Sequence, residues 1–128
     1  MLKLESVAKA FGGVVATDDV SLHFEPGSLS AIIGPNGAGK TTLFNLISGK
    51  LKPDSGRILF DGEDIAGLDE TEIVRRGIGR AFQVASIFPS LTVEESLMAA
   101  VLSHRQQTLR VAERFSHSDA RARAAEII

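Results

Sequence analysis

Polar and apolar residues alternate along the first part of the chain in the way that is typical of β-strands. The segments LKLESVAKAF and SLHF follow this alternation, and Pro26-Gly27 after the second predicts a turn. The run LSAII that comes next is apolar throughout, which predicts a strand buried on both faces. Because this run leads directly into glycines and then a helical pattern, the chain is expected to contain the strand-loop-helix unit of an α/β sheet.

The helix after the glycines is predicted by Leu43, Leu46 and Ile47, which recur at helical spacing, and Gly49 is placed to end it. Further along, GRILFDGEDI predicts two short strands joined by a tight turn. Its Asp61-Gly62 pair tolerates the positive φ that such a turn requires.

The second half of the chain is predicted to be mainly helical. A short helix over ETEIVRR precedes GIGRAFQ, a further strand candidate. TVEESLMAAVL begins with Thr92 and Glu95 at the spacing of a capping box, in which each side chain satisfies a backbone donor of the other residue. The apolar stripe expected on this helix consists of Val93, Leu97, Ala100 and Val101.

Composition narrows the class of protein. The 128 residues are 44% hydrophobic and 23% charged, as in a globular domain, and the formal net charge of -2 with scattered basic residues gives no reason to expect charge-driven nucleic-acid binding. The chain has no cysteine, so disulfides and thiolate metal sites are excluded. The start lacks a secretory signal pattern. The longest apolar run, LMAAVL, is too short for a membrane-spanning helix, so any membrane connection is expected to go through a partner.

The glycine-rich stretch GPNGAGKT fits the pattern G-x-x-x-x-G-K-[ST], known as Walker A, and predicts a site for nucleoside triphosphate and Mg²⁺. Its glycines let backbone N–H groups turn toward phosphate oxygens, Lys40 adds a positive charge at the β and γ phosphates, and Thr41 can place its hydroxyl on Mg²⁺. The alternative is a flexible turn between a strand and a helix. The predicted contacts to the nucleotide come from Gly34, Pro35, Asn36, Gly37, Ala38, Gly39, Lys40, Thr41 and Thr42.

Around this loop the sequence resembles the ATP-binding subunits of ABC transporters over essentially its whole length, from FGGVVATDDVSLHFEPG through GRILFDGEDI to GRAFQ. The resemblance implies an α/β P-loop NTPase fold of the ABC type, with a mixed sheet and an antiparallel β-subdomain around the P-loop helix. It further implies that residues 1–128 are the N-terminal part of one ATP-binding domain. Residues 1–85 would form the nucleotide-binding core, and residues 86–128 the start of a helical subdomain.

The resemblance assigns roles to two residues outside the loop. Phe11 stands where the family stacks an aromatic ring on adenine, although a strand-end core residue is the alternative. Gln83 resembles the glutamine of the family's Q-loop, which would bind Mg²⁺ and sense the γ phosphate, whereas a polar residue closing a strand is the alternative. Lys40 and Gln83 are therefore the catalytic candidates, and Thr41 and Gln83 the metal ligands.

Residues 85–97 look like the region that faces the membrane subunit in this family. Ile87, Phe88 and Pro89 are apolar residues in what should be an exposed linker, which favours a partner surface, and packing beneath the helix that starts near Thr92 is the alternative. The implied partners are transmembrane permease subunits and a second ATP-binding subunit in a head-to-tail dimer. The implied location is the cytoplasmic face of the inner membrane, peripheral through the permease.

Within the family, the sequence most resembles the ATP-binding subunits of branched-chain amino acid importers. The ATP-binding subunits of lipopolysaccharide export systems share much of the segments GIG and ASIF, so they are one alternative. A non-transport ABC protein is a second alternative. A small-molecule kinase is disfavoured, because it would have no reason to carry both Phe11 and Gln83. The family's signature, catalytic glutamate and switch histidine have no counterpart here, so we expect an N-terminal fragment that binds nucleotide but hydrolyses it negligibly. The acids of ILFDGED are interpreted as solvated turn residues. The three histidines have no other ligand-type residue at metal-binding spacing and are interpreted as surface or strand-edge residues.

Overall fold

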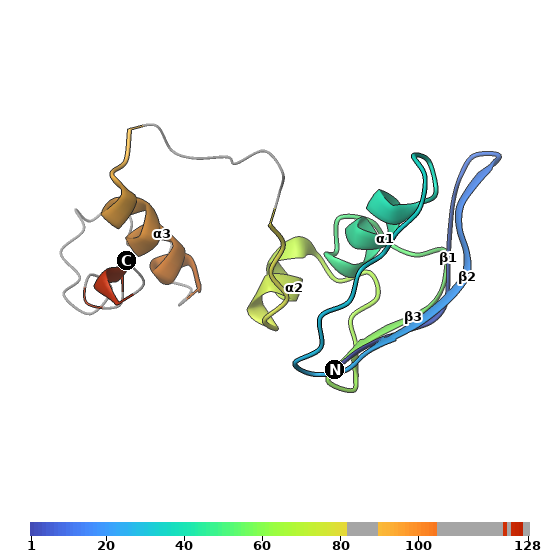
Figure 1. Cartoon of the computed structure of the whole chain (residues 1–128), viewed down its shortest axis with the longest axis horizontal. Coiled ribbons are helices and arrows are strands. Elements are labelled where there is room, and N and C mark those ends of the chain that lie inside the picture. Colours follow the sequence, from blue (N-terminus) through green and yellow to red (C-terminus); the bar gives the residue numbers. More distant parts are fainter. Residues whose placement is uncertain (82–89, 105–121, 123, 127–128) are drawn as a thin grey trace. The chain divides into compact units, whose positions relative to one another are not determined.

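The computed structural model describes residues 1–81, 90–104, 122 and 124–126. The chain divides into two compact units, Met1–Arg80 and Ala81–Ile128. The first unit holds a sheet and two helices, and the second unit holds one long helix among its described residues (Figure 1).

An antiparallel sheet of four strands forms the first unit, in the spatial order β2-β1-β3-β4. Its strands are β1 (Leu2–Phe11), β2 (Val14–Phe24), β3 (Ser55–Phe60) and β4 (Glu63–Asp64). A hairpin joins β3 to β4, as the sequence predicts, and a second hairpin, which was not predicted, joins β1 to β2. Strand β2 is longer than the predicted segment SLHF, because its pairing with β1 extends it back to Val14.

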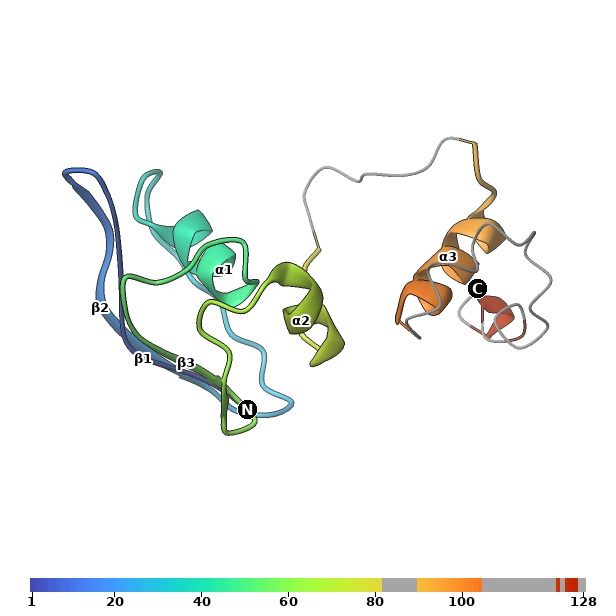
Figure 2. The same ribbon diagram turned by 180° about the vertical axis from the view of Figure 1, so that it is seen from behind.

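One face of this sheet is buried by the helix that follows the glycine-rich loop, α1 (Lys40–Ile47), and α2 (Glu70–Arg75) lies on the same side in both views (Figures 1 and 2). Leu46 of α1 is 1% exposed, and Ile58 of β3 is fully buried. The core cluster consists of Leu4, Val7, Leu43, Leu46, Ile47, Ile58, Ile65 and Ile73. Because apolar burial is the main driving force of folding, this cluster fixes α1 and the loop before it against the sheet.

The prediction of a buried strand over residues 29–33 was wrong. No strand is formed there, and Leu29 and Ile33 are among the most exposed apolar residues, at 101% and 91%. A strand needs a neighbour for its backbone hydrogen bonds, and no other described strand pairs with this run. The sheet of the described residues is therefore antiparallel throughout instead of mixed. Residues 77–81 of the second predicted strand are not in a strand either.

The turns and helix ends were predicted correctly. Asp61 and Gly62 have φ of 49° and 88°, so both central residues of the β3-β4 turn have the positive values that the sequence indicates. Helix α1 ends at Ile47, and Gly49 follows with φ of 77°, a left-handed conformation that commonly ends helices.

The helix of the second unit is α3 (Val93–His104), and its capping box is confirmed. The backbone N–H of Thr92 donates to Glu95 Oε2 at 2.7 Å, and the N–H of Glu95 donates to Thr92 Oγ1 at 3.2 Å. The predicted apolar stripe was displaced by one position. Met98 and Leu102 are each 1% exposed and lie one turn apart, whereas Val93 is 72% exposed at the start of the helix.

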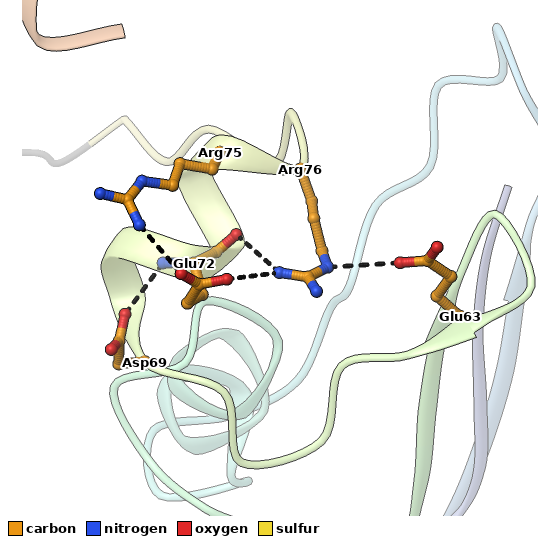
Figure 3. A network of polar contacts seen from close by, with 5 residues as sticks. All are labelled: Glu63, Asp69, Glu72, Arg75 and Arg76. Carbon is orange, nitrogen blue, oxygen red and sulfur yellow. Dashed lines mark hydrogen bonds and ion pairs between the residues drawn. The ribbon is translucent and has the colours of Figure 1, made fainter. Parts of the chain in front are cut away.

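Ion pairs hold α2 and connect it to β4 (Figure 3). Asp69 Oδ1 accepts from the N–H of Glu72 at 2.9 Å and caps the helix. The Glu72 carboxylate accepts from Arg75 Nη1 and Arg76 Nη1, each at 2.9 Å, and Arg76 Nε lies 3.5 Å from Glu63. Arg75 and Arg76 end the helix as predicted, with the favourable sign for its C-terminal dipole.

The Glu72 cluster gives stability a pH dependence. The guanidinium groups of Arg76 and Arg75 hold the pKa of Glu72 below its ordinary value of 4.5 in the folded chain. A carboxyl group whose pKa is lower in the folded than in the unfolded chain stabilises the fold at pH values above its unfolded-state pKa. This contribution is lost as the pH falls through the pKa of the group in the folded chain. Glu72→Gln is therefore expected to lower the thermal midpoint slightly near neutral pH and to have no effect in acid.

The matched control for this prediction is Glu70→Gln, which removes a charge from the same first turn of α2 but leaves the ion pairs of Glu72 intact. Thermal unfolding of the two variants and the parent is followed from neutral to acid pH. If both variants behave alike at every pH, the arginine contacts of Glu72 contribute nothing beyond the helix dipole.

Candidate phosphate-binding site

The loop between Ile33 and α1 is open at the start of the helix. Gly39 caps α1 with φ of 80° in the left-handed region, and no side chain accepts a hydrogen bond at this cap. Gly37 also has a positive φ of 86°, and the N–H of Ala38 donates to the Pro35 carbonyl at 3.3 Å. The first N–H groups of a helix have no partner within the helix and attract anions, so this end of α1 is built to take one.

Strand β2 supports the loop from one side. A Cβ atom built on Gly39 would stand 2.1 Å from the backbone oxygen of Ala16, so the two backbones approach too closely for any other residue type. Glycine is therefore required at position 39 for two reasons. The position has a left-handed backbone conformation, and there is no room for a side chain beside Ala16. Contact with β2 fixes the loop relative to the sheet.

Lys40, the first residue of α1, extends its side chain back across the loop. Its Nζ donates to the carbonyl oxygens of Gly34 and Pro35, each at 2.6 Å. The ammonium group therefore lies beside the loop backbone, where a phosphate bound by the helix N-terminus would meet a positive charge. Thr41 is exposed next to it, and Thr42 is half-buried.

A cavity of about 200 Å³ lies beside this loop, lined by Gly39 and Lys40 together with residues of β2. Thr17 in its wall is only 7% exposed, and its Oγ1 has no hydrogen-bond partner within the described part of the chain. Sequence reasoning missed this hydroxyl, because a threonine in an alternating strand carries no signal that distinguishes it from a packing residue.

Phe11 lies at the end of β1 and exposes 48% of its surface, so it is not a core residue. The turn that follows it and the glycine-rich loop lie at the same end of the first unit in both views (Figures 1 and 2). Lys9 Nζ lies over the Phe11 ring, 5.8 Å from its centroid. The sequence did not single out Lys9, because only the strand geometry shows which residues approach the ring.

Gln83, Ile87, Phe88 and Pro89 lie outside the described residues, so their predicted roles are not tested here. The segment that leads to Gln83 is nevertheless joined to α1. Arg80 Nη1 donates to Asn45 Oδ1 at 2.7 Å and to Ser48 Oγ at 3.2 Å.

The metal-binding potential of the site is limited to few groups. Residues 1–81, 90–104 and the short described part near the C-terminus contain no cluster of three or more His, Cys, Asp or Glu side chains. The donor at the loop that suits Mg²⁺ is the exposed Thr41 hydroxyl, which fits a metal held mostly by phosphate oxygens. The acids of the β3-β4 turn have structural contacts instead, since Asp61 pairs with the amino group of Met1 and Glu63 with Arg76.

A left-handed glycine loop at the start of a helix, with a lysine reaching back across it, fits the phosphate-binding loop of a P-loop NTPase, and the matches to known proteins give its class as ATP-binding cassette. The sequence model of one family, described as ABC transporter, matches residues 17–127, so the chain belongs to the ABC transporter family. No helix among the described residues has the length and apolar character needed to cross a membrane.

Two curated relatives come from transport systems with different cargo. The chain is 40% identical over 104 residues to the high-affinity branched-chain amino acid transport ATP-binding protein BraF of Pseudomonas aeruginosa. It is 44% identical over 101 residues to the lipopolysaccharide export system ATP-binding protein LptB of Haemophilus influenzae. These matches cover 81% and 79% of the chain but only 41% and 42% of the relatives, so the chain spans less than half of their length.

Solved structures show the same fold. The structure of a nucleotide-free ATP-binding cassette from an ABC transporter aligns with 99% of this chain and with 52% of the cassette's own length, with a TM-score of 0.81 and 34% sequence identity. The structure of a dimeric post-hydrolysis cassette bound to ADP and Pi aligns with 98% of this chain and with 55% of the cassette's own length, with a TM-score of 0.71 and 31% sequence identity. The predicted fold class, an α/β P-loop NTPase fold of the ABC type, is confirmed, and the described residues form its antiparallel sheet.

Proposed function

We propose that the chain belongs to an ATP-binding subunit that energises a membrane transporter, most closely an importer of branched-chain amino acids. The observation that carries this proposal is the loop of residues 34–39, which presents the uncapped start of α1 and the Lys40 ammonium on one side of the sheet. The similarity to BraF supports the cargo. The similarity to LptB makes lipopolysaccharide export the second candidate.

Each site residue has a proposed task. The N–H groups of residues 34–42 bind the phosphates, Lys40 neutralises the β and γ charge, and Thr41 contributes its hydroxyl to Mg²⁺. Phe11 stacks on adenine, and its half-exposed ring at the end of β1 is consistent with that task. Gln83 is proposed to contact Mg²⁺ and attacking water, with Arg80 anchoring the segment that leads to it to α1.

We further propose that residues 1–128 bind ATP and contribute little hydrolysis by themselves. Turnover needs a carboxylate that orients or deprotonates the attacking water, and the resemblance places that group in the part of the relatives beyond the matched region. Mg²⁺, when bound, would supply charge neutralisation on the phosphate oxygens. The roles of this chain are to position the polyphosphate and to keep the Lys40 ammonium against it.

The proposed partners are permease subunits in the membrane and a second ATP-binding subunit placed head to tail. The dimeric neighbour with ADP and Pi supports the second partner. The proposed location is the cytoplasmic face of the inner membrane, reached through the permease. Residues 1–85 would form the nucleotide-binding core, and residues 86–128 would begin the helical subdomain that contacts the permease.

Lys40→Ala is expected to weaken ATP binding by about 10- to 100-fold, because a charge-assisted hydrogen bond to phosphate contributes about 1.5–3 kcal/mol. Calorimetry of the purified chain with Mg-ATP measures the change, and Lys50→Ala, at an exposed lysine beyond the C-terminus of α1, is the matched control. Equal ATP affinity of the parent and Lys40→Ala would contradict the proposed site.

The cargo is tested by whether the full subunit restores leucine uptake in cells that lack their own ATP-binding subunit.

A further inference from the structure

The ring of Phe11 is backed on one side by a positive charge. Lys9 lies two residues earlier on β1, so both side chains project from the same face of the strand, and the Lys9 Nζ stands over the ring at 5.8 Å from the centroid. This distance is within the range of a cation–π contact. The side chain of Lys9 is only 17% exposed, whereas Phe11 is 48% exposed, so about half of the Phe11 surface stays accessible although Lys9 Nζ stands over the ring.

Asp54 holds the Lys9 ammonium in this position. Its Oδ1 accepts from Lys9 Nζ at 2.6 Å, and its Oδ2 accepts from the N–H of Ala10 at 2.8 Å. The N–H of Asp54 in turn donates to the carbonyl of Ala8 at 2.9 Å. The hydrogen bonds from Lys9 and Ala10 hold the pKa of Asp54 below its ordinary value of 3.8, so the carboxylate is ionised at neutral pH. Three contacts therefore fix this residue, which lies just before β3, against the end of β1.

We propose that Lys9 and Asp54 are positioning residues that fix the Phe11 ring as a platform for a purine base. This inference rests on the proposed function, because it gives a structural basis to the stacking role of Phe11. Lys9 occupies one side of the ring and keeps water from it, and Asp54 keeps Lys9 in place. The open side of the ring is left for the base.

The physical effect of this arrangement is on the nucleoside part of a ligand and not on its phosphates. A ring that is held in one orientation loses less side-chain entropy when a base stacks on it, so the binding free energy gains from preorganisation. The phosphates are held by the loop and by Lys40, whose contacts to Gly34 and Pro35 do not involve Lys9. Base and phosphate contributions can therefore be measured separately.

The experiment compares ATP with inorganic tripolyphosphate, which carries similar charge but no base. Lys9→Met is expected to weaken ATP binding about threefold to tenfold and to leave tripolyphosphate binding unchanged. Lys3→Met is the matched control, because Lys3 is on the same strand and also pairs with a carboxylate, Glu5, at 2.7 Å, but lies over no aromatic ring of the described residues. Lys9→Arg is expected to restore ATP affinity, since a guanidinium keeps the charge and the contact to Asp54.

The outcomes separate this inference from the proposed function. A loss for ATP alone in Lys9→Met, with Lys3→Met unchanged, supports the platform. Equal affinities of Lys9→Met and the parent for ATP, while Lys40→Ala loses both probes, would overturn the platform and leave the phosphate site standing. An equal loss for both probes would show that Lys9 acts only as a distant charge and would also overturn it. If neither probe binds the parent, both proposals are wrong.

Discussion

Gly56→Ala is expected to destabilise the first unit by about 3 kcal/mol or more, a large part of the stability of a small domain. Gly56 lies in β3 with φ of 87°, which costs an alanine strain energy. A Cβ atom there would also stand 2.4 Å from the Ser6 carbonyl oxygen and 2.6 Å from the Glu5 oxygen. These contacts are with backbone atoms of β1, so only a shift of the central strand pair relieves them.

Gly62→Ala is the matched control for this prediction. Gly62 has nearly the same backbone conformation, with φ of 88°, but a Cβ atom there meets nothing within 4 Å. It is therefore expected to cost only the conformational strain, about 1 kcal/mol. Urea unfolding of the two variants and the parent gives both values. Similar midpoints for Gly56→Ala and Gly62→Ala would mean that the β1-β3 contact yields easily and that the steric argument is wrong.

The parts of the fold that local chemistry determines could be predicted from the sequence. The Asp61-Gly62 turn, the Thr92-Glu95 capping box and the end of α1 at Gly49 each depend on neighbouring residues alone, so the amino-acid pattern was sufficient. The glycine-rich loop belongs to this group, because its backbone conformation follows from glycine at Gly37 and Gly39.

Burial that depends on distant parts of the chain could not be predicted. The apolar run of residues 29–33 has the composition of an inner strand, but its exposure is decided by whether other strands pair with it. The platform under Phe11 is of the same kind. Lys9 and Asp54 are 45 positions apart, and they meet only because β1 pairs with β3. Arg80 and Asn45 are also far apart in the sequence and are joined by a hydrogen bond only in the folded chain, so the sequence alone could not assign Arg80 a role.

Gly39→Ala is expected to abolish measurable ATP binding. The substitution places a Cβ atom 2.1 Å from the Ala16 oxygen and forces an alanine into φ of 80°. The loop can relieve both only by moving off β2 and changing the cap of α1, which turns the first N–H groups of the helix away from the position of the phosphates. Because phosphate binding depends on several such donors at once, their loss exceeds that of the single Lys40 contact.

Gly27→Ala separates this effect from the general cost of replacing a left-handed glycine. Gly27 has φ of 72° in the turn after β2, and a Cβ atom there meets nothing within 4 Å. It is expected to lower the thermal midpoint slightly and to keep the ATP affinity of the parent. Calorimetry with Mg-ATP, on variants shown by circular dichroism to be folded, makes the comparison. A folded Gly39→Ala chain that binds ATP like the parent would show that contact between β2 and the loop does not shape the site.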